Sequence, residues 1–173
     1  MRVVLLGHSQ VPREDVNLDD FTLECVRCGG AYIKDFYRNP MREYVESNPD
    51  VIFCWIGGND LAKHDADEVI EQLLNLVDYL AQHTANIYLF NIEDRKYPGE
   101  EYTKYYMHQA NIVNRRLKQL AQRRRTFRTV NVAGQDMSGD SDDIHFGVNG
   151  LRWVYNKIRI AVNYAIRDGT VNL

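Results

Sequence analysis

The sequence has little cysteine and no long apolar run. Three cysteines, an odd number in a chain of 173 residues, argue against a disulfide framework and favour a reducing compartment. No apolar stretch approaches the length of a membrane-spanning helix, and the first residues lack the regions of a secretory signal. We therefore expect a cytoplasmic protein without a transmembrane segment.

Internal repeats, low-complexity tracts and long linkers are also missing. With 45% hydrophobic and 26% charged residues, the composition predicts a globular protein with a full core. The length predicts a single domain over residues 1–173. Because a strand-like run starts as early as residue 2, the chain is also compatible with one domain of a longer protein.

The pair Cys25 and Cys28 has the spacing of a redox motif or of half a zinc site. A second cysteine or histidine pair at zinc-ribbon distance is missing. Free thiols at a strand end are therefore the favoured interpretation, and metal or redox chemistry is the weaker alternative. We expect no metal and no cofactor.

Acidic residues are missing between Tyr102 and Gln135, a stretch that contains the arginine run Arg123, Arg124 and Arg125. One interpretation is electrostatic contact with nucleic acid or anionic lipid. The other, which we favour, is a solvated helix end where cations complement the helix dipole. The net charge of −3 is too small to indicate a partner, and no RNA-binding signature is visible.

Five short apolar runs predict buried strands. The third run is continuously apolar, as expected of a strand that is covered on both faces. Apolar residues at spacings of three and four predict helices between and after the later runs, and Pro12–Asp20 and Ala31–Tyr44 have weaker patterns that favour short helices. The predicted strands are Arg2–Leu6, Leu23–Arg27, Val51–Ile56, Asn86–Asn91 and Phe127–Val132.

Strands that alternate with helices predict an α/β protein with a three-layer doubly wound fold. We expect a five-stranded parallel sheet of order 2-1-3-4-5 with helices on both faces. Ligands in such sheets bind beyond the carboxyl ends of the strands, where the strand order reverses. The irregular stretch Glu93–Glu101 belongs to the same rim and is predicted to act as a lid or a specificity wall. Three polar or glycine-rich segments follow strands at this rim: Gly7-His8-Ser9, Gly29-Gly30 and Gly57-Gly58-Asn59-Asp60.

Ser9 and His145 are the candidate catalytic pair. A serine where a strand turns into a helix can act as a nucleophile if a base takes its proton. His145 is the candidate base, and Asp142, three residues earlier, can orient its imidazole. Asp140 and Asp143 are alternatives to Asp142. Taken singly, Ser9 is better explained as a turn cap. His145, taken singly, is also explained as part of an exposed acidic loop.

Three groups can stabilise the oxyanion of an acyl-transfer intermediate. They are the backbone N–H groups of Ser9 and Gly30 and the side-chain amide of Asn59. Glycine at position 30 allows a ligand to approach the backbone closely. Taken singly, Gly29-Gly30 is also explained as a plain turn, and Asn59-Asp60 as a helix cap.

Together these motifs, in this order along nearly the whole chain, resemble the SGNH family of GDSL-type esterases and lipases. The family's Gly-Asp-Ser appears as Gly7-His8-Ser9, its second-block glycine as Gly30, its Gly-x-Asn-Asp as Gly57-Gly58-Asn59-Asp60, and its Asp-x-x-His as Asp142-Asp143-Ile144-His145, with Gly150 beyond and with Asn111 and Asn114 as further common features. The resemblance implies a metal-independent serine esterase that forms an acyl-enzyme on a small ester or a lipid. Because a chain of this size leaves little room for a lid domain, we favour short acyl groups such as acetyl.

His8 is the one departure, because the family has aspartate beside the nucleophile. The Gly-His-Ser variant, with Arg27-Cys28-Gly29-Gly30-Ala31 after the second strand, is similar to the esterase domains of first-open-reading-frame proteins of LINE-type retrotransposons. That resemblance implies a longer parent protein that self-associates and binds nucleic acid. The alternative function is a non-catalytic module on the same fold that binds nucleic acid or anionic lipid.

Overall fold

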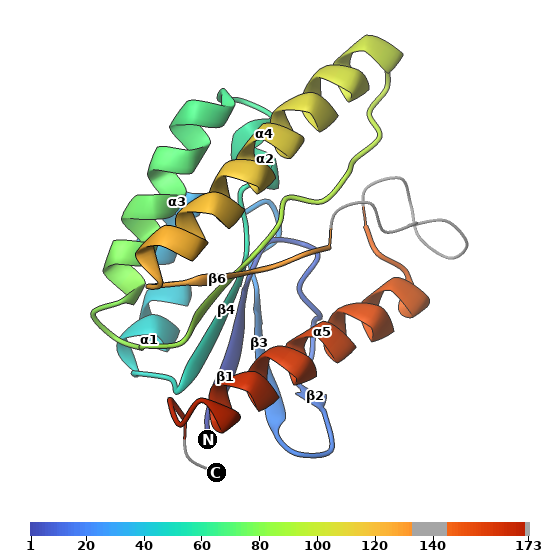
Figure 1. The fold of residues 1–173 in the computed structure, drawn as a ribbon. Helices are drawn as coiled ribbons and strands as arrows, with labels where there is room; N and C mark the ends of the chain where they lie inside the picture. The colour runs from blue at the N-terminus through green and yellow to red at the C-terminus, as the bar shows by residue number, and fades with distance from the viewer. Residues whose placement is uncertain (133–144, 172–173) are drawn as a thin grey trace.

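The structure is a computed structural model that describes residues 1–132 and 145–171. In the described part of the chain, six strands form one sheet in the order β2-β3-β1-β4-β5-β6, and every neighbouring pair except β2–β3 is parallel (Figure 1). The five predicted strands take the predicted order, so the doubly wound α/β prediction is confirmed. The strands are β1 (Val3–Gly7), β2 (Val16–Asn17), β3 (Thr22–Arg27), β4 (Val51–Trp55), β5 (Ile87–Phe90) and β6 (Arg128–Val130).

The edge strand β2 is a correction to both the predicted strand count and the predicted helix over Pro12–Asp20. It pairs antiparallel with the start of β3 through a tight turn. Asp19 has a φ of 61° in that turn, a left-handed conformation that aspartate tolerates better than most residues. Two residues are too few to show the alternation of a strand, and this is why the pattern missed it.

Helices cover both faces of the sheet, as expected (Figure 1). In β1, Val4 and Leu6 point into the core beneath α1, α3 and α4, whereas Val3 and Leu5 point into the core beneath α5. Two-sided burial explains why these strands are continuously apolar. The helices are η1 (Ile33–Tyr37, a 3₁₀ helix), α1 (Met41–Glu46), α2 (Gly58–Leu61), α3 (Ala66–Leu80), α4 (Glu100–Arg124) and α5 (Val148–Arg167).

The carboxyl ends of β1, β3 and β4 are tied together at one rim. A β carbon at Gly7 would lie 2.1 Å from the Trp55 carbonyl oxygen, so only glycine allows this approach. The same carbonyl accepts the His8 N–H at 3.1 Å, and Cys28 N–H donates to the Gly7 carbonyl at 2.9 Å. Ser9 therefore leaves β1 next to the segments that follow β3 and β4.

Residues 1–132 and 145–171 contain no helix that is both long and apolar enough to cross a bilayer. Nor does this part of the chain bring together three or more histidine, cysteine or acidic side chains that could hold a metal ion. Cys25 and Cys28 are free thiols. Burial raises the pKa of Cys25 to about 12 and raises the pKa of Cys28 as well, and protonated thiols are poorly suited to redox chemistry.

Candidate active site

Ser9 and His145 are 136 positions apart in the chain and meet at this rim. The Ser9 Oγ lies 2.7 Å from His145 Nε2, which is hydrogen-bonding distance. Both side chains are only half-buried. This geometry allows the imidazole to take the hydroxyl proton when the serine attacks a substrate. Asp142, the predicted orienting residue, lies outside the described residues, as do its alternatives Asp140 and Asp143.

Gln10 and Phe146, the chain neighbours of Ser9 and His145, join the two segments. Phe146 N–H donates to Gln10 Oε1 at 3.0 Å in a buried hydrogen bond. The Phe146 ring packs on Trp55 with 5.5 Å between ring centroids. A β carbon at Gly150 would lie 2.5 Å from this phenyl ring, so the start of α5 needs glycine. Sequence analysis missed Gln10 and Phe146, because neither belongs to a motif.

The three predicted oxyanion donors lie on the segments that follow β1, β3 and β4. Gly30 is exposed, and its φ of 74° lies in the left-handed region that favours glycine. Among the described residues, neither Ser9 N–H nor Gly30 N–H donates a hydrogen bond. Asn59 Nδ2 donates to the Ala31 carbonyl at 2.9 Å, which holds the amide beside the Ala31–Tyr32 peptide, one residue beyond Gly30. The second amide proton of Asn59 remains available to a ligand.

A buried ion pair holds the other side of the Asn59 amide. Arg95 Nη1 donates to Asn59 Oδ1 at 2.9 Å, while Arg95 Nε and Nη2 donate to Glu93 Oε1 at 2.8 and 2.6 Å. Trp55 Nε1 donates to the second Glu93 oxygen at 3.3 Å. A β carbon at Gly58 would lie 2.5 Å from Arg95 Nη2, so this glycine makes room for the guanidinium group. Asn59 is therefore clamped at both ends of its amide.

Glu93 and Arg95 come from the stretch predicted to act as a lid or specificity wall, and for these two residues that prediction is wrong. Only 1% of the surface of Glu93 and 5% of that of Arg95 is exposed. Burial alone would raise the pKa of Glu93, but the positive charge of Arg95 keeps it below its ordinary value. Asn114 of α4 fixes the preceding residue, Ile92, by accepting its N–H at 2.8 Å and donating to its carbonyl at 2.9 Å. The segment therefore supports the site from within the protein.

His8 is fully buried and faces the same carboxylate. Its Nδ1 accepts the Gln10 N–H at 3.3 Å, so the proton of the neutral ring is on Nε2, 3.6 Å from Glu93 Oε1. Burial lowers the pKa of His8 to about 4, although the charge of Glu93 opposes this shift. A neutral ring thus stands where the family has an aspartate, and a carboxylate from the segment after β5 lies next to it.

We expect His8 to make the protein less stable in acid. Its pKa is 6.5 in the unfolded chain and about 4 in the folded one, so the unfolded state binds more protons between these values. The stability that comes from keeping His8 neutral is fully present above the unfolded pKa of 6.5 and is lost as the pH falls towards 4. This loss lowers the free energy of unfolding by on the order of 3 kcal/mol. Urea denaturation between pH 7.5 and 4.5 measures it.

A His8→Asn variant is expected to lose this part of the pH dependence. His108→Asn is the matched control, because His108 is exposed on α4. If His8→Asn and the wild-type protein lose the same stability between the two pH values, the assignment to His8 is wrong.

The arginine run occupies the end of α4. Arg123 and Arg124 lie in the last turn of the helix, and Arg125 ends it with a φ of 58°. Arg124 Nη1 lies 3.4 Å from Asp78 Oδ1 on α3. These positions agree with the interpretation as a helix end, and contact with nucleic acid or lipid stays a prediction.

No family model and no curated protein sequence matches this chain. Its structure, by contrast, is similar to solved structures. A GDSL-like lipase from Bacteroides thetaiotaomicron superimposes with a TM-score of 0.78 and 16% identity, covering 95% of this chain and 88% of the lipase. A carbohydrate esterase of family 3 from Talaromyces cellulolyticus gives 0.72 and 15%, covering 97% and 99%. The acetylxylan esterase Axe2 from Geobacillus stearothermophilus gives 0.65 and 13%, covering 93% and 94%. The chain therefore has the fold of these GDSL-type lipases and carbohydrate esterases.

Proposed function

We propose that the protein is a serine esterase that hydrolyses short-chain carboxylic esters such as acetyl esters. The contact of 2.7 Å between Ser9 Oγ and His145 Nε2 carries this proposal. It joins a nucleophile to a base at the rim where sheets of this kind bind ligands. The shared fold supports the ester as the substrate class, because the similar structures include a lipase and an acetylxylan esterase.

In the proposed mechanism, Ser9 Oγ attacks the acyl carbon while His145 Nε2 takes the hydroxyl proton. The developing oxyanion accepts hydrogen bonds from Ser9 N–H, Gly30 N–H and Asn59 Nδ2. His145 then gives the proton to the alcohol oxygen, the carbon–oxygen bond breaks, and an acyl-serine remains. Water then attacks the acyl carbon while His145 takes its proton. The bond from the acyl carbon to Ser9 Oγ breaks, His145 returns the proton to the serine oxygen, and the carboxylic acid leaves. We assign to Asp142 the role of orienting the imidazole.

We propose that residues 1–173 form one esterase domain and that this domain acts in the cytoplasm. The similarity to retrotransposon esterase domains depends on Gly7-His8-Ser9 and on the segment from Arg27 to Ala31, and it stays a prediction. Self-association within a longer parent protein and contact of Arg123–Arg125 with nucleic acid or anionic lipid stay predictions with it.

Labelling with a fluorophosphonate probe tests the proposal without knowledge of the substrate, because the probe reacts with activated serines. We expect one labelled peptide, containing Ser9, and strongly reduced labelling in His145→Ala. Ser47→Ala, which removes an exposed serine at the end of α1, is expected to label like the wild-type protein. If Ser9 of the wild-type protein is not labelled, its hydroxyl is not activated and the proposal is wrong.

A further inference from the structure

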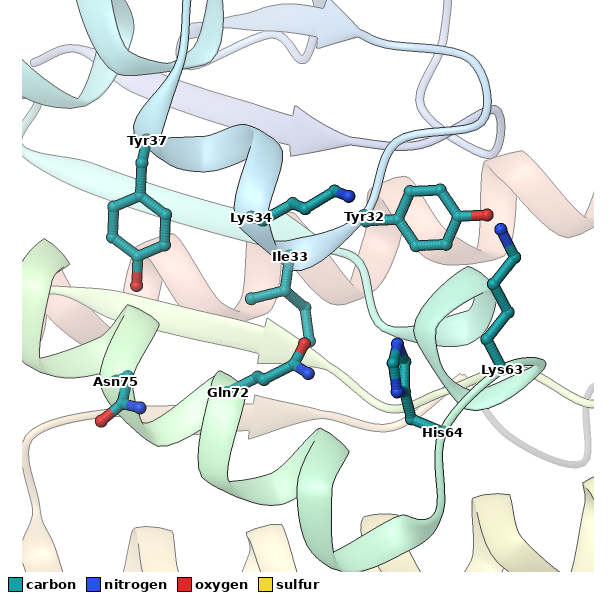
Figure 2. Close-up of a pocket in the computed structure, with 8 residues that line it drawn as sticks. All are labelled: Tyr32, Ile33, Lys34, Tyr37, Lys63, His64, Gln72 and Asn75. Carbon is teal, nitrogen blue, oxygen red and sulfur yellow. The ribbon is translucent and has the colours of Figure 1, made fainter.

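A pocket of about 420 Å³ lies between η1, the middle of α3 and the segment that joins α2 to α3 (Figure 2). This volume is typical of a site for a small molecule. None of the eight lining residues is acidic, and Ile33 is the sole aliphatic one. Gln72 and Asn75 contribute side-chain amides from α3. The pocket therefore offers a ligand amide groups and aromatic rings, and its lining contains no carboxylate.

Two lysines bring positive charge to one end of the pocket. Lys34 Nζ lies 5.5 Å and Lys63 Nζ 4.6 Å from the centroid of the Tyr32 ring. Figure 2 shows both ammonium groups directed towards this ring. Cation–π contacts of exposed groups are worth about 0.5–1 kcal/mol each and offset part of the repulsion between the two cations. In the part of the chain that the structure describes, neither lysine forms an ion pair with a carboxylate.

Three acidic residues that are close to these lysines in the sequence have other partners. Asp35 accepts the N–H of Tyr32, the N-cap of η1, at 2.8 Å, and Asp60 accepts the N–H of Ile33, the first residue of η1, at 3.2 Å. Glu68 lies 2.9 Å from the ring nitrogen of His64. The positive charge at this end of the pocket contrasts with the net charge of −3 of the whole chain. An anionic ligand would supply the counter-charge that the protein does not.

The walls of the pocket continue from the segments that carry the proposed oxyanion donors. Tyr32 follows Gly30 by two residues, and Lys63 follows Asn59 by four. The bond of 2.9 Å from Asn59 Nδ2 to the Ala31 carbonyl fastens the two segments together just before they enter the pocket. The pocket and the proposed oxyanion donors therefore share two chain segments, one after β3 and one after β4.

We propose that this pocket binds a carboxylate or phosphate on the alcohol portion of the ester, so that the enzyme prefers anionic acetyl esters to neutral ones. The inference rests on the proposed esterase function. Lys34 and Lys63 pair with the anionic group, and the amides of Gln72 and Asn75 are placed for hydroxyl groups of the same ligand. The esterase substrate class is thereby narrowed to acetylated molecules with one negatively charged group.

The kinetic test uses 4-acetoxybenzoate and 4-acetoxybenzamide, which share the acetyl group and differ in charge. We expect the wild-type enzyme to have the higher kcat/KM for the anion. The double variant Lys34→Gln, Lys63→Gln should lower this preference about tenfold, because it removes two ion pairs between exposed lysines and the substrate anion. Added salt should weaken the preference of the wild-type enzyme, because it screens the same two interactions. Lys104→Gln, an exposed lysine on α4 paired with Glu100, should keep the preference. A preference that is absent in the wild-type enzyme or unchanged in the double variant overturns the proposal.

A binding experiment separates this proposal from the catalytic one. Amide NMR shifts of Ser9→Ala are followed during titration with glucuronate, glucose 6-phosphate and glucose. We expect shifts at Lys34 and Lys63 with at least one of the two anions and not with glucose, and the better anion distinguishes carboxylate from phosphate. If the amides of Lys34 and Lys63 shift but the wild-type protein hydrolyses no ester, the proposed esterase function is wrong and the pocket is an anion-binding site. Hydrolysis at Ser9 without such shifts would refute the anion site.

Discussion

Replacing Ser9 by alanine is expected to lower kcat for p-nitrophenyl acetate by on the order of 10⁴-fold or more, the scale for removal of the nucleophile from a serine–histidine pair. The variant keeps Gly30 and Asn59, so residual acceleration over the reaction in water should remain. Because Ser9 Oγ and His145 Nε2 are 2.7 Å apart and act on one proton, the two residues should behave as a unit. His145→Ala alone and the variant lacking both side chains should therefore be about as slow as Ser9→Ala.

The same assay identifies the carboxylate that orients His145. Asp140→Asn, Asp142→Asn and Asp143→Asn are compared at equal protein concentration, and we expect Asp142→Asn to lose the most activity. Loss of the orienting carboxylate costs up to about 10⁴-fold in related catalytic groups. A wild-type rate in Ser9→Ala, or losses from Ser9 and His145 that multiply in the double variant, would contradict the proposed pair.

Much of the fold was predictable because apolar runs of strand length alternate with helical patterns. Val51–Ile56 is continuously apolar in the sequence, and in the structure β4 is covered on both faces. The handedness of crossovers between parallel strands predicts the doubly wound arrangement, and 2-1-3-4-5 is a common strand order of such sheets. Among the strands in residues 1–132 and 145–171, β2 alone was missed, and a helix was predicted in its place, since its two residues pair through a turn and not through a periodic pattern.

The predicted site residues each belong to a recognisable motif. The residues that support the site belong to no such motif. Gln10 and Phe146 meet across 136 positions, and nothing in either residue type signals the contact. Glu93 and Arg95 are charged, and charged residues in an irregular segment ordinarily indicate exposure. Here an ion pair and hydrogen bonds to other buried groups compensate their burial, which depends on tertiary contacts that periodicity does not record.

Replacing Arg95 is expected to have the second large effect. In Arg95→Met, Glu93 is left buried without its cation, and loss of one partner of a buried pair costs about 3–5 kcal/mol of folding free energy. Arg95→Lys keeps a positive charge near Glu93 but lacks the fork of donors that reaches both Glu93 and Asn59. The lysine variant should therefore be closer to the wild-type protein in urea denaturation. Arg116→Met, which removes a half-exposed arginine paired with Asp67, is the control and should change stability little.

Catalysis separates a positioning role of Arg95 from a purely structural one. Arg95 holds Asn59 Oδ1 at 2.9 Å, and the proposed role of Asn59 is to bind the oxyanion, which exists only after attack. We therefore expect Arg95→Lys to lower kcat by about 10- to 100-fold, below the cost of losing an oxyanion donor outright, with KM nearly unchanged. Asn59→Ala should lose about 10²–10³-fold, and adding Arg95→Lys to it should cost little more. If the two losses multiply, Arg95 does not act through Asn59. If Arg95→Lys keeps the wild-type kcat, the ion pair stabilises the fold beneath the site without orienting the amide.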